Sequence, residues 1–80
     1  MDRNQIEKTV LAVLGTVLKI PFPAGTDVRR RDCPKWDSLK HIEIMFILED
    51  ELSIEFSEDE LAALDSVGCI VDAILVNHAA

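Results

Sequence analysis

Residues 36–52 read WDSLKHIEIMFILEDEL, and they predict one long amphipathic helix against which the rest of the chain must pack. Asp37 lies where a helix amino cap would lie, so we expect the helix to run from Ser38 to Leu52. Apolar side chains that recur every four residues predict a face turned toward a core. That face comprises Ile44, Leu48 and Leu52, with Met45 and Ile47 beside them.

The same helix carries a second apolar line, which lies too far round the helix to share the buried face. Leu39, Ile42 and Phe46 fall at i, i+3 and i+7. Acidic residues flank them, namely Glu43, Glu49 and Asp50. An exposed apolar patch with an acidic rim is typical of a docking site for a partner protein that carries a basic patch.

A helix is also expected before this one. Residues 2–18 place apolar side chains at i, i+4, i+7, i+8 and i+11, counted from Ile6, and Pro21 and Pro23 then prevent the helix from continuing. Residues 19–36 show no clear period. A connection of this length exceeds what compact domains usually contain without a reason, so we expect a long crossover loop between the first two helices.

Two more helices should follow. Ser57 and Glu60 form a capping box for a short third helix, which includes Leu61 and Leu64. After a cap at Asp65-Ser66, the apolar spacing over residues 67–75 predicts a last helix that ends near residue 77. The predicted fold class is therefore all-α, a four-helix bundle with a short third helix and a long loop between helices one and two.

Length and composition restrict the chain to one small domain, residues 1–80. The 80 residues are 49% hydrophobic and 29% charged, which argues against intrinsic disorder and allows one core to form. The longest run without a charge, residues 9–18, is about half of what a membrane span needs. Residues 1–5 lack the pattern of a secretory signal, so we expect a cytoplasmic protein in which Cys33 and Cys69 are reduced thiols.

The charge is unevenly distributed along the sequence. Residues 1–37 carry seven basic and five acidic side chains, net +2, whereas residues 38–80 carry one basic and ten acidic side chains, net −9. Such a surface repels phosphate backbones, so nucleic acid is an unfavourable partner and a basic protein patch is a favourable one. We expect an acidic bundle of this size to be a monomer.

Catalytic and metal-binding motifs are missing from the sequence. It contains no glycine-rich phosphate loop and no HExxH, CxxC or GxSxG motif. The acidic stretch 49–60 lacks the central glycine of an EF-hand, so we predict no metal site.

Ser38 and His41 lie three residues apart, which leaves a hydrolytic dyad as an alternative. Arg29–Arg31 is a candidate phosphate-binding run, although solvated charge is the more ordinary interpretation, and we expect Trp36 to pack against the start of the second helix.

Ser38 is the most informative residue. Its hydroxyl would stand at the positive end of a helix, where free backbone N–H groups and the helix dipole favour a phosphate ester. Ser38 belongs to the first of an ordered series of motifs: Asp37-Ser38-Leu39, Glu43, Glu49-Asp50-Glu51-Leu52, Ile54-Glu55, Glu58-Asp59-Glu60 and Ser66-Val67-Gly68. In this series, over nearly the whole chain, the sequence resembles the acyl carrier proteins.

The resemblance implies a non-catalytic carrier. A phosphopantetheinyl transferase would attach 4′-phosphopantetheine from coenzyme A to Ser38, within the motif that Asp37 and Leu39 flank, and the arm would hold acyl groups as thioesters. The second helix would bind acyl-loading, acyl-transferring or condensing enzymes through Leu39, Ile42, Glu43, Phe46, Glu49 and Asp50. Family carriers shelter the acyl chain between helices, for which Ile44, Met45, Leu48, Ile70 and Ile74 are candidates, although core packing explains the same residues.

Two departures from the family pattern distinguish this chain. Lys40 stands where primary fatty-acid carriers usually have an acid, and Pro34-Lys35-Trp36 replaces the usual small residue and glycine before Asp37. These differences leave room for a specialised carrier in a lipid, polyketide or peptide pathway. The alternatives are an aminoacyl or peptidyl carrier, and a helical interaction protein in which Ser38 is only a cap or a phosphorylation site.

Overall fold

The computed structural model describes residues 2–23 and 25–78, except for the side chains of residues 77 and 78. The fold is all-α, as predicted, and its helices are α1 (Arg3–Leu18), α2 (Ser38–Leu52), α3 (Glu58–Ala63) and α4 (Val67–Ala73). A π-helical turn, Ile74–His78, continues α4, so the last helical segment extends one residue beyond its predicted end. Among helices of the described residues, none is long and apolar enough to cross a membrane.

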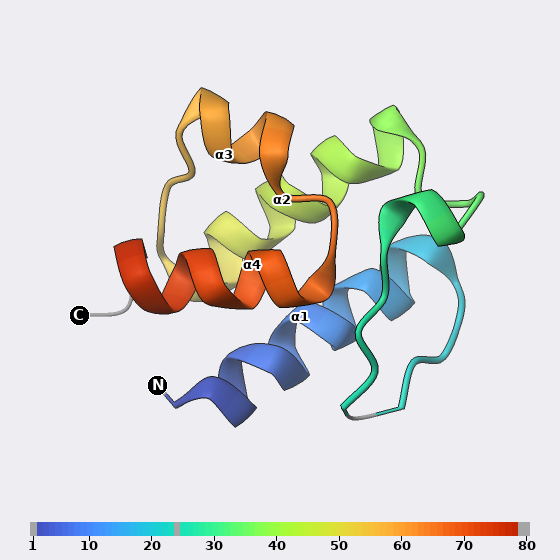
Figure 1. Ribbon diagram of the computed structural model, residues 1–80, viewed down its shortest axis with the longest axis horizontal. Helices are drawn as coiled ribbons and strands as arrows, with labels where there is room; N and C mark the ends of the chain where they lie inside the picture. Colours follow the sequence, from blue (N-terminus) through green and yellow to red (C-terminus); the bar gives the residue numbers. More distant parts are fainter. Residues whose placement is uncertain (1, 24, 79–80) are drawn as a thin grey trace.

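Helices α2 and α4 both pack against α1 (Figure 1). The short α3 lies at the top of Figure 1, away from α1. Arg3 in the first turn of α1 donates a hydrogen bond from Nη1 to Oδ1 of Asp72 in the last turn of α4, at 2.6 Å. This hydrogen bond, together with the negative charge of Asp72, raises the pKa of Arg3. Both side chains are largely exposed, so the pair contributes little to stability.

Local capping chemistry sets the helix starts. The predicted caps Asp37, Ser57 and Ser66 are confirmed, since each side chain accepts a backbone N–H from the first turn of its helix. Asp2 caps α1 by accepting the Gln5 N–H at 2.8 Å, so that helix begins at the following residue. Each capped helix thereby satisfies one of the backbone donors that its first turn leaves without a partner.

The core forms where the predicted apolar faces meet. Every apolar residue predicted for the inner face of α1 is buried, and Ile44, Met45 and Leu48 of α2 are 0% exposed. The prediction was wrong for Ile47, which is 38% exposed, and too strong for Leu52, which is half-buried. Each residue turns the helix by about 100°, so the arc around Ile44 and Leu48 leaves Ile47 beyond its edge. Leu52 ends the helix, where neighbours cover it on fewer sides.

The crossover between α1 and α2 is tied to the start of α4. Arg29 and Ser66 form an isolated antiparallel bridge, in which the Arg30 N–H donates to the Asp65 carbonyl and the Val67 N–H donates to the Val28 carbonyl, both at 2.8 Å. A 3-10 helix, Arg30–Asp32, follows directly and is the green turn in Figure 1. The sequence predicted a long crossover but neither of these two features.

Candidate functional site

Ser38 is the first residue of α2, and its side chain is exposed. The preceding residue, Asp37, caps the helix by accepting the Lys40 N–H at 2.9 Å. Ser38 itself therefore does not cap the helix, and its hydroxyl faces the crossover loop. There, Nη2 of Arg30 donates a hydrogen bond to Ser38 Oγ at 2.9 Å. The hydroxyl thus stands at the positive end of a helix, beside a cation.

Arg30 is held in place from two sides. Its backbone N–H donates to Asp65 O in the bridge described above, and its Nε donates to the backbone carbonyl of Trp36 at 3.2 Å. Neither bond involves a carboxylate, and within residues 2–23 and 25–78 no ion pair forms with this guanidinium. Sequence reasoning placed Arg30 in a run of three arginines without distinguishing it from its neighbours.

Trp36 and His41 connect the loop, α2 and α3. Trp36 is 2% exposed, and its Nε1 donates to Nδ1 of His41 at 3.0 Å. The other ring nitrogen of His41 lies 2.7 Å from the carbonyl of Leu61. Since the indole N–H can only donate, His41 Nδ1 accepts, and the protonated Nε2 donates a hydrogen bond to the Leu61 carbonyl. The packing predicted for Trp36 is confirmed.

These bonds remove the basis of the hydrolytic dyad. A histidine that acts as a general base must present a ring-nitrogen lone pair to the nucleophile. His41 is only 5% exposed, and both of its ring nitrogens are hydrogen-bonded, to Trp36 and to Leu61. The Ser38 hydroxyl is paired with Arg30 instead. Among the described residues, no group of His, Cys, Asp or Glu side chains is arranged to hold a metal ion.

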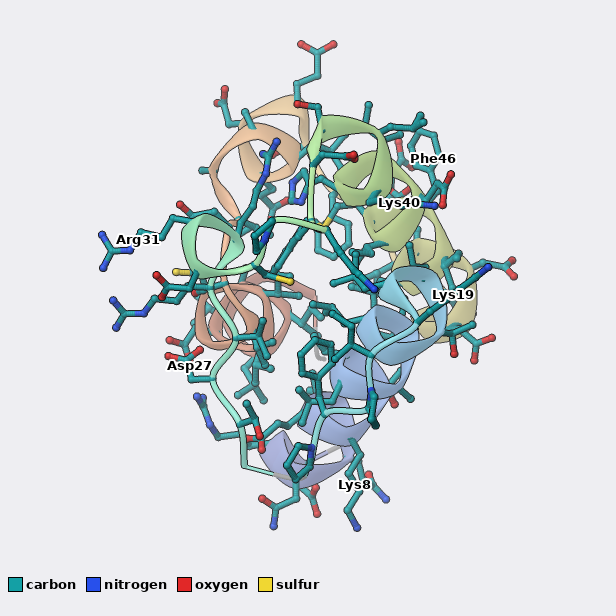
Figure 2. All side chains as sticks on the ribbon, turned by 90° about the vertical axis from the view of Figure 1, so that its right-hand side faces the viewer. Lys8, Lys19, Asp27, Arg31, Lys40 and Phe46 are labelled. Carbon is teal, nitrogen blue, oxygen red and sulfur yellow. The ribbon has the colours of Figure 1, made fainter. Side chains whose placement is uncertain are left out.

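The second apolar line of α2 is exposed as the sequence indicated. Leu39 is 65%, Ile42 is 49% and Phe46 is 57% exposed, and Figure 2 shows Phe46 and Lys40 on the outward side of α2. We call Leu39, Ile42 and Phe46 the apolar patch. Ile47 adds to its edge, and the 100° step of the helix is the signal that would have placed it there.

The acidic rim of the apolar patch is less uniform than the sequence suggests. Glu43 and Asp50 are exposed, but Glu49 is half-buried and its Oε2 accepts the Phe56 N–H at 2.7 Å. Glu49 therefore also holds the chain that leaves α2. Lys40 Nζ lies 3.7 Å from Glu43 Oε2. The lysine therefore offsets part of the negative charge of Glu43 at the end of the apolar patch nearest Ser38.

The residues named as candidates for sheltering an acyl chain lie in the core. They are 0–2% exposed and comprise Ile44, Met45, Leu48, Ile70 and Ile74. Close packing among apolar neighbours accounts for their positions. A role in sheltering a chain stays a prediction.

Comparison with known proteins supplies one relative of direct interest. A curated protein named "Acyl carrier protein", from Saccharopolyspora erythraea, is 30% identical to this chain over 76 residues. The aligned segment covers 94% of this chain and 80% of the relative. No family model matches the chain, and no solved structure matches it significantly.

Proposed function

The chain belongs to the acyl carrier protein family, and from that premise we propose that it carries acyl groups on a 4′-phosphopantetheine arm attached to Ser38. Bound there, the arm would supply a terminal thiol that holds an acyl group as a thioester. The observation that carries the proposal is the position of Ser38, exposed at the start of α2 and beside Arg30. Residues 1–80 would then form a single carrier domain.

The surroundings of Ser38 fit this modification chemically. A transferase would use Ser38 Oγ as the nucleophile toward the phosphorus of coenzyme A that bears the pantetheine. The Oγ–phosphorus bond forms, the bond from that phosphorus to the adenosine 3′,5′-bisphosphate portion breaks, and the serine proton leaves with a base. Oγ is accessible and accepts its hydrogen bond from Arg30, so its own proton is not committed to that contact. The positive end of α2 suits the phosphate that results.

The apolar patch and its acids supply a surface for partner enzymes. We propose that phosphopantetheinyl transferases and acyl-loading, acyl-transferring or condensing enzymes dock on α2 through Leu39, Ile42, Glu43, Phe46, Glu49 and Asp50. The exposed aromatic ring and aliphatic side chains would be buried in the complex, and the acids would attract basic patches. The sequence differs from primary fatty-acid carriers at the start of α2. There Lys40 pairs with Glu43, and Trp36 is buried. These differences beside Ser38 favour a carrier in a specialised pathway.

Enzymatic modification tests the proposal. The purified protein is incubated with coenzyme A, Mg²⁺ and a broad-specificity phosphopantetheinyl transferase, and intact and peptide masses are measured. We expect a gain of one phosphopantetheine on the peptide that contains Ser38, and no gain in Ser38→Ala. Ser57→Ala is the matched control, because it removes another serine hydroxyl at a helix start and should be modified normally. An unmodified wild-type protein would overturn the proposal.

A further inference from the structure

Arg30 is more firmly oriented toward Ser38 than a solvated loop arginine needs to be. Bonds to Ser38 Oγ, to the Trp36 carbonyl and, through its backbone, to the Asp65 carbonyl fix it on three sides. We propose that Arg30 is the phosphate-binding residue of the modified protein, with its guanidinium holding the phosphodiester that joins the arm to Ser38. This inference rests on the proposed function, because it needs a phosphodiester at Ser38.

The charges around Ser38 favour a cation beside a phosphodiester at this position. A phosphodiester is an anion at neutral pH, and the Asp37 carboxylate stands one residue before it as the cap of α2. Two anions at one helix start repel each other, and the helix dipole offsets this only in part. Lys40 lies near Glu43 instead. Arg30 is the cation that already contacts the oxygen to which the phosphorus would be bonded.

The guanidinium has donors left for a phosphate. An arginine side chain carries five N–H donors in a planar fork and binds phosphate oxygens with two of them at once. The structure uses Nε for the Trp36 carbonyl and one Nη2 donor for Ser38. The remaining donors belong to Nη1 and Nη2. Since Nε and the backbone already hold the residue, less conformational entropy is lost when a phosphate binds.

The two neighbouring arginines lie in different surroundings. Arg29 and Arg31 are exposed and line a surface hollow whose other lining residues include Asp27, Asp65 and Asp72. Figure 2 shows Arg31 pointing outward from the loop. The 3-10 helix therefore separates the three side chains, and within the described part of the chain only Arg30 bonds to Ser38. Arg31 thus provides a charge-matched control.

We expect one hydrogen bond of Arg30 to change its acceptor, from Ser38 Oγ to a phosphate oxygen, when Ser38 is modified. While Ser38 Oγ is a free hydroxyl, Arg30 Nη2 donates to it. Once Oγ is bonded to phosphorus it is a poorer acceptor, and the charged phosphate oxygens beside it are stronger ones. Arg30 then donates to those oxygens while its Nε keeps the Trp36 carbonyl. The same interaction would stabilise the negative charge as the Oγ–phosphorus bond forms, which speeds modification.

Nuclear magnetic resonance and modification kinetics together test this inference. In the wild-type protein, we expect the Arg30 Nη–H resonances to shift on modification, because the Nη2 bond changes its acceptor, and the Arg31 Nη–H resonances to stay in place. In modified Arg30→Gln, prepared with excess transferase, the ³¹P resonance should shift from its wild-type position. The kcat/KM of modification should fall roughly tenfold, the effect of one lost charge-assisted hydrogen bond. Arg31→Gln, which removes the same charge, should leave both quantities near wild type.

Arg30→Lys separates charge from geometry. Lysine keeps the positive charge but lacks the planar fork, so we expect partial recovery of kcat/KM. Circular dichroism checks that each variant is folded, and the wild-type resonances test the inference even if a variant does not fold. Resonances of Arg30 that do not change on modification would overturn the inference, as would an Arg30→Gln protein that matches Arg31→Gln. In either case, a normal mass gain on Ser38 would leave the proposed function standing, whereas no mass gain in the wild type would overturn both.

Discussion

Asp37 and Ser38 are neighbours with separate tasks at the start of α2. Asp37 accepts the Lys40 N–H and begins the helix, which frees the Ser38 hydroxyl to face Arg30. The two tasks differ in how far the sequence reveals them. A cap depends on residues within one helical turn, so Asp37, Ser57 and Ser66 were predictable. The Arg30–Ser38 contact depends on the bridge to Ser66, which residue spacing alone does not indicate.

The capping role of Asp37 gives a prediction at this scale. Replacing Asp37 with alanine removes the acceptor for the Lys40 N–H and should lower the free energy of unfolding by about 1 kcal/mol. Asp37→Asn keeps a good capping side chain without the charge, so its stability should be near that of the wild type. Urea denaturation monitored by circular dichroism measures both. An alanine variant as stable as the wild type would contradict the assigned capping role.

At the scale of the elements, the helices were far easier to predict than their connections. α2 runs from Ser38 to Leu52 as predicted, because its caps and periodicity are local in sequence. The predicted burial of Ile47 was wrong, because the core covers only the arc of α2 that holds Ile44, Met45 and Leu48, and Ile47 lies outside that arc. The bridge in the crossover could not be predicted from periodicity, because its partner, Ser66, lies far along the chain, just before α4. The 3-10 helix has only three residues, which is too short to show a period.

The hydrogen bonds from Trp36 to His41 and from His41 to Leu61 join three of these elements. Trp36→Phe removes the indole donor and leaves Nδ1 of buried His41 without its partner. We expect the free energy of unfolding to fall by about 1–3 kcal/mol. Modification of Ser38 should persist, because Arg30 bonds the backbone carbonyl of residue 36, which the substitution retains.

A double-mutant cycle isolates this interaction. Combining Trp36→Phe with His41→Leu should destabilise the protein by less than the sum of the two single substitutions, because the contact is lost only once. Thermal or urea unfolding of the four proteins provides the data. Strict additivity would show that the Trp36–His41 bond contributes nothing beyond separate packing.

At the scale of the whole molecule, charge and exposed apolar surface lie on the same element. Residues 38–80 carry a net charge of −9, and the apolar patch lies on α2 within that half. Long-range attraction from such a surface raises the rate of encounter with basic partners, and salt at physiological strength screens it over about 8 Å.

Glu43 provides the test of this arrangement. Glu43→Gln should slow association with a basic partner such as a phosphopantetheinyl transferase by a few-fold at low salt, and the difference should shrink as salt is added. The free energy of unfolding should change by less than about 1 kcal/mol, because within the described residues Glu43 makes only a solvent-accessible pair with Lys40. Stopped-flow association rates measure the effect, and Glu55→Gln, an exposed acid beyond the end of α2, is the control. Equal rates for the two variants at every salt concentration would contradict a docking role for α2.

Acyl carriage on Ser38 can be measured in protein isolated from the cells that make it. The mass of the Ser38 peptide is determined before and after treatment with hydroxylamine. The proposed function predicts one phosphopantetheine on Ser38, with an additional acyl group that hydroxylamine releases. A serine that is unmodified, or that carries phosphate alone, would contradict it and favour a helical interaction protein.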